Sequence, residues 1–450
     1  MTLRRVSQTA VLAALLGMPL AAAASGGPHL GPVAVEFILF GCVLAGVALF
    51  HLHALRIAVG GAIVIALFKI LWSPFHAGAG LGGFVAHLGH EWVVLSNLLL
   101  LLLGFALLAD LFEKSEVPAM LPRFLPDDWK GCFVLLLLVF VLSSFLDNIA
   151  AAMIGGAMAQ TLFRGKVHIG YLAAIVAASN AGGAGSVVGD TTTTMMWIAG
   201  VHPLEVLEAF IASGVAVVVC GIPAALKQQA YSPITRDAGA EVHIDWARVA
   251  IVAFILLAAI AVNILVNTRF SAVADVFPFL GAAVWVAILL GALLRQPQWQ
   301  VLPGAFKGSV FLLSLVLCAS MMPVEELPRA SWQTAFGLGF VSAVFDNIPL
   351  TELALKQGGY DWGFLAYAVG FGGSMIWFGS SAGVALSNMY PEARSVGLWL
   401  RHGWFVVLAY TVGFFVMLAL LGFHPGSTPK TAQASPAAAT APVAAPVPGQ

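Results

Sequence analysis

The sequence predicts an all-α polytopic membrane protein with about ten transmembrane helices and two re-entrant hairpins, arranged as two inverted repeats with broken helices. Three observations support this fold class. The 450 residues are 60% hydrophobic and only 9% charged, whereas soluble domains have roughly 45–50% and 25%. Long apolar segments follow one another along the chain, and two polar motifs of the first half recur in the second half.

The two ends of the chain differ from the rest. Residues 1–24 are typical of a secretory signal peptide, because Arg4 and Arg5 precede a short apolar core and Ala22, Ala23 and Ala24 offer a cleavage site. An uncleaved first helix is the alternative. Residues 426–450 are rich in Ala, Pro and Thr, so we expect a disordered tail. The net charge of −1 gives no basic surface for nucleic acid, and the four isolated cysteines predict neither a metal site nor a disulfide.

Ten apolar segments are candidate membrane spans. They lie near residues 32–50, 57–73, 91–112, 168–200, 203–225, 246–267, 275–294, 308–322, 362–387 and 402–422. The first repeat is predicted over residues 32–225 and the second over 246–422, with a cytoplasmic linker at 226–245 between them.

Two further apolar segments, about 131–163 and about 332–355, carry a polar break in the middle. Each is either a long kinked span or a re-entrant hairpin of two short helices. Two hairpins, with the mature N-terminus and the C-terminal tail in the periplasm, place most basic residues in cytoplasmic loops. The basic residues left outside are then Arg269, Arg329, Lys356 and Lys430. The positive-inside rule therefore favours two hairpins, the first entering from the cytoplasm and the second from outside.

The two halves are related at their polar breaks. Ser143-x-x-x-Asp147-Asn148-Ile149 recurs as Ser342-x-x-x-Asp346-Asn347-Ile348. Each hairpin is followed by a span that glycines are expected to break. These helix-breaking glycines are Gly182, Gly183 and Gly189 in 168–200, and Gly372, Gly373 and Gly379 in 362–387. Inverted repeats with interrupted helices at matching places predict a secondary transporter whose site lies near the membrane midplane.

The stretch "SNAGGAGSVVGDTTTT" predicts the ion site. We expect it to unwind from Ala181 to Gly189 and to restart as a helix at Asp190. A charge at the bilayer centre costs at least about 2.5–3.5 kcal/mol, so Asp147, Asp190 and Asp346 need a proton or a cation. Acids that bind either are typical of proton–cation exchange, and the oxygen-rich neighbours suit a small hard cation. Asp147 and Asp190 are the expected metal ligands for this transported ion.

The chain resembles the ion transporter superfamily, and most closely its NhaD-type sodium/proton antiporters, in "FLDN", "NAGGAGSVVGDTTTTMMWI", "FDNIPL" and "GGSMIWFGSSAGVAL". The resemblance implies export of Na+ or Li+ against inward protons across a bacterial inner membrane, without a cofactor, by a homodimer with a moving transport domain. By position, it implies a cation- and proton-binding set at Asp147, Asn148, Asn180, Asp190, Thr191, Thr192, Asp346, Asn347 and Ser380.

The sequence also bears on two other classes of function. An anion or oxyanion carrier of the same superfamily, for citrate or arsenite, is the alternative transporter. An intramembrane aspartyl protease, with Asp147 and Asp190 as a dyad, lacks the Tyr-Asp and Gly-x-Gly-Asp motifs, so no enzyme is expected. Glu352, in the returning arm of the second hairpin, is expected to reach the outer surface, and a proton relay is the alternative.

Overall fold

The structure is a computed structural model that describes residues 27–50, 53–76, 78–121, 125–234, 243–270 and 276–429. The predicted signal peptide lies outside these residues. Residues 235–242 of the predicted linker and 430–450 of the predicted tail also lie outside them.

Helices make up 75% of the residues that the structure describes. A short antiparallel pair of strands, β1 (His29–Leu30) and β2 (Val33–Ala34), precedes them. The helices of the first half are α2 (Val35–Leu49), α3 (Ala54–Trp72), α4 (Gly80–Glu113), α5 (Val117–Met120), α6 (Trp129–Ser143), α7 (Asn148–Leu162), α8 (Ile169–Ala184), α9 (Thr191–Ile198), α10 (Pro203–Leu207) and α11 (Ala209–Tyr231).

The second half also contains both long and short helices. They are α12 (Trp246–Arg269), α13 (Phe279–Ala292), η4 (Trp299–Val301), α14 (Leu302–Ser320), η5 (Val324–Glu326), α15 (Trp332–Ser342), α16 (Asn347–Gln357), α17 (Trp362–Gly372), α18 (Ser381–Met389), η6 (Pro391–Ala393) and α19 (Val396–Leu421).

The helices have the length and surface of membrane spans. Within the described residues, six helical segments are long and apolar enough to cross a bilayer. They cover residues 54–72, 80–113, 203–231, 246–266, 299–320 and 396–421. Large apolar side chains on their outer faces, such as Leu257 on α12 and Leu420 on α19, are exposed as lipid contact requires. The prediction of an all-α multi-pass membrane protein is confirmed, whereas the count of ten spans stays a prediction.

One predicted boundary is wrong by three turns of helix. The span expected to begin at residue 91 is the end of α4, which begins at Gly80. Residues 80–90 contain four glycines and two histidines, so their composition suggests a loop. Packing overrides this preference, because Gly83 and His87 of this first part are buried.

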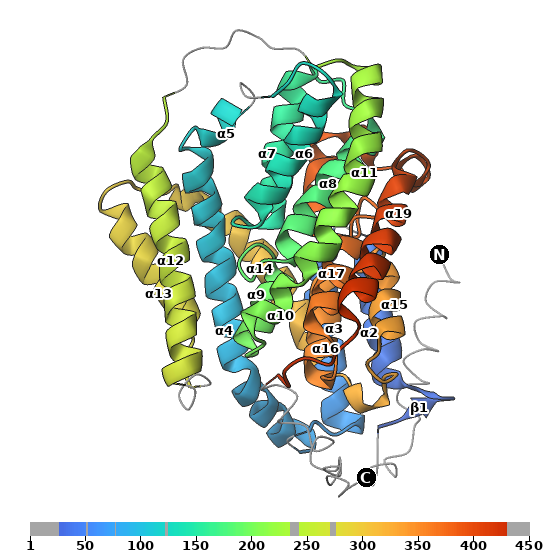
Figure 1. Ribbon diagram of the computed structural model, residues 1–450. Helices are drawn as coiled ribbons and strands as arrows, with labels where there is room; N and C mark the ends of the chain where they lie inside the picture. Colours follow the sequence, from blue (N-terminus) through green and yellow to red (C-terminus); the bar gives the residue numbers. More distant parts are fainter. Residues whose placement is uncertain are drawn as a thin grey trace, which may run out of the picture.

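The two broken helices form the centre of the molecule. Every residue of α8 from Gly170 to Ala184 is buried, and so is every residue of α17. Helices α6, α11 and α19 pack around α8, while α3 and α4 pack on α14. Helices α12 and α13 pack on each other and on α4 at one side (Figure 1). A helix buried on all sides has no lipid-facing surface, so α8 and α17 can carry polar groups.

Two helix–turn–helix units flank this centre. Residues 144–147 join α6 to α7, and residues 343–346 join α15 to α16. Figure 1 shows α6 and α7 in the upper part of the molecule and α15 and α16 in the lower part. The short turns of the two units therefore approach the centre from opposite ends.

Candidate functional site

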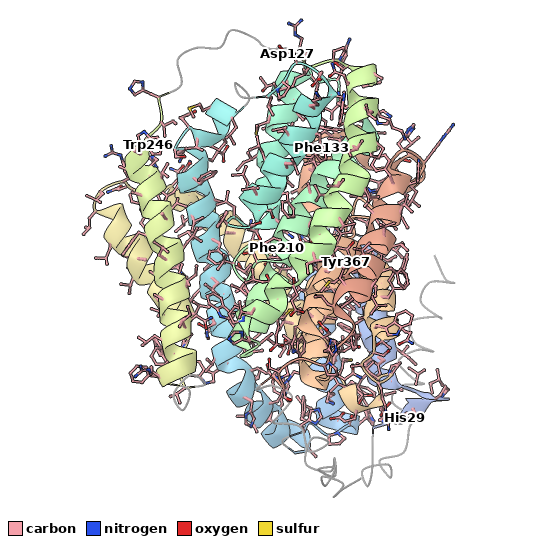
Figure 2. The ribbon with its side chains drawn as sticks, viewed as in Figure 1. His29, Asp127, Phe133, Phe210, Trp246 and Tyr367 are labelled. Atoms are coloured by element: carbon pink, nitrogen blue, oxygen red, sulfur yellow. The ribbon has the colours of Figure 1, made fainter. Side chains whose placement is uncertain are left out.

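The candidate site lies where the two central helices are interrupted. Helix α8 ends at Ala184 and α9 begins at Thr191, while α17 ends at Gly372 and α18 begins at Ser381. Phe210 of α11 packs against Gly185, the first residue of the first break. In Figure 2, Phe210 lies midway between Asp127 at one end of the molecule and His29 at the other. The breaks are thus at mid-height.

Gly182 and Gly183 do not break the first helix, contrary to the prediction of unwinding from Ala181. Both lie in the last turn of α8, and the break starts at Gly185. Instead, these two glycines let the backbone of α8 come close to neighbouring backbone. A methyl group on Gly182 would overlap the carbonyl oxygen of Phe140, and one on Gly183 would lie 2.9 Å from the carbonyl oxygen of Gly189. Glycine is therefore required where α8 meets α6 and its own continuation.

The second break repeats this arrangement. Gly372 is the last residue of α17, and a methyl group on it would overlap the backbone of Gly339 in α15. A methyl group on Gly373 would lie 2.8 Å from the carbonyl oxygen of Gly379. In both broken helices, one glycine of the pair packs against the first helix of the neighbouring helix–turn–helix unit, and the other packs against the continuation of its own chain.

Asp190 collects hydrogen bonds from both halves of the molecule. Its carboxylate is 3% exposed and caps the N-terminus of α9. Asn148 Nδ2 lies 3.4 Å from Asp190 Oδ1, and Asn347 Nδ2 lies 3.3 Å from Asp190 Oδ2. The Thr192 hydroxyl donates to Oδ2 at 2.9 Å. The two helix–turn–helix units therefore converge on one buried carboxylate through one amide each.

Asn180 extends this network to the second break. Its Nδ2 donates to the Ser374 hydroxyl at 2.9 Å and the Ser380 hydroxyl at 3.1 Å, while its Oδ1 accepts from Asn148 Nδ2 at 3.1 Å. Asn180 is fully buried, as are Ser374 and Ser380 within 1%. The result is one connected set of amides, hydroxyls and a carboxylate across the two breaks.

Asp147 and Asp346 hold positions that differ from that of Asp190. Each is the N-cap of the second helix of its unit: Ile149 N–H donates to Asp147 Oδ2 at 3.2 Å, and Ile348 N–H donates to Asp346 Oδ1 at 3.0 Å. Asp346 also accepts from the Ser381 hydroxyl at 3.2 Å. Both carboxylates are half-buried, and both satisfy backbone groups at helix ends. Of the three acids, only Asp190 joins side chains from both halves.

The threonines after Asp190 divide into two pairs. Thr191 is half-buried at the start of α9, and Thr192 donates to Asp190 as described. Thr193 donates to the carbonyl of Ser186 at 2.5 Å, and Thr194 to that of Val187 at 3.0 Å. The second pair therefore satisfies carbonyl groups that the interrupted helix leaves free.

Three serines outside the predicted binding set complete the site. Ser374 bonds Asn180, Ser381 bonds Asp346, and the Ser186 hydroxyl donates to the carbonyl of Ser144 at 2.6 Å. Ser374 and Ser381 lie in the quoted motif "GGSMIWFGSSAG", so hydroxyl groups throughout the break were the available signal.

The ligand set is made of hard oxygen donors. No group of three or more His, Cys, Asp or Glu side chains with metal-binding geometry occurs in the part of the chain that the structure describes. Carboxylate, amide and hydroxyl side chains converge instead at the N-terminus of α9, where the helix dipole favours negative charge, and Asn148 and Asn347 direct N–H groups at Asp190. Such a set can bind a small hard cation or hold a proton on Asp190.

The comparisons with known proteins agree with this chemistry. A scan against models of protein families finds no match. Sodium/proton antiporter 1 of Arabidopsis thaliana is 26% identical over 71% of this chain, and the chain covers 59% of that protein, less than two thirds of its length. The Na(+)/H(+) antiporter NhaD of Halomonas elongata is 27% identical over 90% of this chain and 93% of its own length. The NhaD protein of Vibrio parahaemolyticus is 28% identical over 63% of this chain and 78% of its own length. By sequence, the chain is therefore similar to the NhaD-type sodium/proton antiporters of several bacteria.

Proposed function

We propose that this protein exchanges Na+ or Li+ for H+ across a bacterial inner membrane, with Asp190 as the carboxylate that binds cation and proton in turn. The observation that carries the proposal is the convergence of Asn148 and Asn347 on the two oxygens of buried Asp190. The relatives of this chain, which are named as sodium/proton antiporters, support the same exchange.

Competition for one charge explains the coupling. A cation needs the carboxylate of Asp190 deprotonated, and a proton on that carboxylate removes the charge that holds the cation. The site is 3% exposed and depends on donors from two units, so an empty charged state is costly there. The site therefore changes its access from one membrane face to the other only with a cation or a proton bound, which is the requirement for exchange.

The amides allow the site to serve both states. In the structure, Asn148 and Asn347 turn their N–H groups toward Asp190. A half-turn of either amide presents its oxygen at nearly the same point, because the two ends of an amide are similar in size. We propose that these oxygens, with Asn180, Thr191, Thr192 and Ser380, complete the shell around a cation at Asp190. Asp147 and Asp346 fix the helix ends that carry the amides and contribute negative potential.

The helix arrangement suggests the moving parts. We propose that α6–α9 and α15–α18 move as a transport unit, with the two helix–turn–helix units as re-entrant hairpins from opposite membrane faces. The remaining helices would form a scaffold, through which two copies associate as a homodimer. Loops predicted as periplasmic then lie at the end of the molecule marked by His29, and cytoplasmic ones at the end marked by Asp127 (Figure 2).

A substrate panel on the reconstituted protein tests the proposal. Liposomes containing the purified protein and a trapped pH-sensitive dye receive Na+, Li+, K+ or citrate from outside. We expect Na+ or Li+ to move protons in the opposite direction. In addition, the apparent affinity for Na+ should rise by up to about tenfold per pH unit while the site is mainly protonated. Protein-free liposomes are the control. Citrate uptake without any cation-driven proton movement would overturn the proposal.

A further inference from the structure

A second buried charge cluster joins the scaffold to the helix that follows Asn347. It consists of Glu91 on α4 and of Glu352 and Lys356 on α16. Lys356 Nζ lies 2.6 Å from Glu91 Oε1 and 3.9 Å from Glu352 Oε1. Glu352 is 1% exposed and Glu91 5% exposed. The expectation that Glu352 reaches the outer surface is therefore wrong, because α14 packs along α16 and Glu91 of α4 reaches its last turn.

The three charges do not balance. Two carboxylates and one ammonium leave a net charge of −1 in a buried place, and Lys356 is engaged mainly with Glu91. Glu352 Oε1 is a buried oxygen that accepts no hydrogen bond. Its cationic neighbour Lys356 is 3.9 Å away and is shared with Glu91, so a charged Glu352 is costly, and protonation removes that cost without disturbing the pair of Lys356 with Glu91.

The surrounding charged groups do not neutralise Glu352. His87 of α4 bonds the Ser320 hydroxyl at 3.0 Å. Lys69 of α3 lies over the ring of Phe75, 5.3 Å from its centroid. Among the described residues, His76 and Glu325 also flank the cluster; Glu325 lies in η5, and its Oε1 is 3.5 Å from His76 Nδ1. Each of these groups has a contact of its own, so the excess negative charge stays on the two glutamates.

Glu352 lies on the route from the site to one end of the molecule. It follows Asn347 by five residues on α16, which corresponds to roughly 7–8 Å along a helix. Asn347 bonds Asp190, and Lys356 is near the C-terminus of the same helix. In Figure 1, α16 extends toward the end of the molecule at which β1 lies. A proton on Glu352 is thus between Asp190 and the end that we propose to be periplasmic.

We infer that Glu352 is a second proton-binding site, which takes a proton from the periplasmic water and passes it toward Asp190 as the cation leaves. This inference rests on the proposed exchange of cations for protons. The carboxylate of Glu352 is the proton acceptor, and the carboxylate of Asp190 is the acceptor of the next transfer, so no other reactant is needed. Glu91 and Lys356 are positioning residues that keep the relay carboxylate without a competing partner.

The alternative is a purely structural ion pair, and it predicts the opposite result. The close partner of Lys356 is Glu91, so Glu352→Gln leaves the ion pair intact and removes a surplus buried charge. A structural cluster is then undisturbed or more stable in that variant. By contrast, Glu91→Gln removes the close partner of Lys356 and should lower the thermal unfolding midpoint. A relay predicts that Glu352→Gln folds normally and loses proton transfer.

Two exchange modes measured on the same liposomes separate these roles. Na+/H+ exchange needs proton transfer, whereas exchange of radioactive sodium for unlabelled sodium needs only the cation site. We expect Glu352→Gln to slow Na+/H+ exchange at least about tenfold and to leave sodium self-exchange within about twofold of the unaltered protein. Glu352→Asp should restore part of the proton-coupled rate, and Glu325→Gln is the matched control for loss of a nearby carboxylate.

The outcomes distinguish this inference from the proposed function. Unaltered Na+/H+ exchange in Glu352→Gln would overturn the relay, and so would an equal loss of both exchange modes. If the unaltered protein moves no protons in response to Na+ or Li+, the proposed function itself is wrong, whatever the variant does.

Discussion

At the break of the first half, Asp190 caps α9 with φ −141° and ψ 145°; at the corresponding break of the second half, Ser380 caps α18 with φ −140° and ψ 153°. The hairpin caps agree as well, since Asp147 and Asp346 both have φ −53° and ψ 141°. The backbone frame is thus repeated to within a few degrees, while the side chains at the centre differ. One half supplies the charge and the other supplies a neutral hydroxyl.

The position of Asn180 shows the same asymmetry. The second-half counterpart of Asn180 is Gly370, because Gly182 corresponds to Gly372. A methyl group on Gly370 would lie 3.6 Å from Asp190 Oδ2. The second half therefore leaves room beside the carboxylate of the first half. The two halves thus share the conformation of these caps, while side chains from both meet at a single buried carboxylate, Asp190.

The largest expected effect is that of Asp190→Asn. Asparagine caps a helix about as well as aspartate, so the variant removes the charge and keeps the α9 N-terminus. Loss of one partner from a buried charge interaction costs about 3–5 kcal/mol, which is at least about 100-fold in cation affinity. Cation-driven proton movement in liposomes should therefore fall below detection.

The matched control for this variant is Asp128→Asn. Asp128 is also a helix N-cap, for α6, but its side chain is 51% exposed and far from the breaks in sequence. Exchange should be unchanged in the control. If Asp190→Asn keeps normal exchange, or Asp128→Asn loses it, then the asymmetry between Asp190 and Ser380 is not the basis of ion binding.

An intermediate effect is expected from the two hairpin amides, Asn148→Ala and Asn347→Ala. In the proposed cation-bound state each amide supplies an oxygen ligand, and interactions with a charged group contribute about 1.5–3 kcal/mol, so each variant should weaken apparent Na+ affinity by at least about tenfold. Asn148 also donates to Asn180 Oδ1, whereas Asn347 donates to Asp190 alone. The first variant should therefore have the larger effect in a Na+ titration of proton movement.

The control for the amides is Asn388→Ala, on the exposed side of α18, where the titration should not change. Equal effects of the Asn148 and Asn347 variants would indicate that the hydrogen bond between Asn148 and Asn180 does not contribute to the apparent Na+ affinity. An effect of only one variant would mean that ligands come from a single repeat, contrary to the convergence on Asp190.

Most of the fold was predictable because its signals are long. Apolar runs predicted the helices, and the repeated Asp-Asn-Ile triplets predicted both turns near Asp147 and Asp346, where the chain does turn. The start of α4 was not predictable, because its glycines and histidines resemble a loop until Gly83 and His87 meet their tertiary neighbours.

The candidate site was predictable by residue type but not by role. The glycine- and threonine-rich motif of the first half predicted Asp190 and Asn180 as site residues, and the two acids Asp147 and Asp190 predicted an ion in that half. It could not predict that Asn347, far away in sequence, bonds the same carboxylate as Asn148, because that contact depends on how the two halves pack. The burial of Glu352 was missed for the same reason, since it depends on the packing of α14 along α16 and on the contact of Glu91 with Lys356, both far away in sequence.

The smallest expected effects concern the glycines at which the broken helices α8 and α17 contact the neighbouring helix–turn–helix units. Gly182→Ala places a methyl group against the Phe140 carbonyl, and Gly372→Ala places one against three backbone atoms of Gly339. Overpacking of this kind costs about 1–3 kcal/mol, so both variants should lower the thermal unfolding midpoint in detergent, Gly372→Ala by more. Gly337→Ala on α15 is the control: no atom lies within 4 Å of its added methyl group, and alanine favours helix by about 1 kcal/mol. Its midpoint should stay constant or rise. If Gly372→Ala behaves like this control while Gly182→Ala does not, the two breaks are not equivalent contacts, and the likeness of the halves is limited to the dihedral angles of their caps.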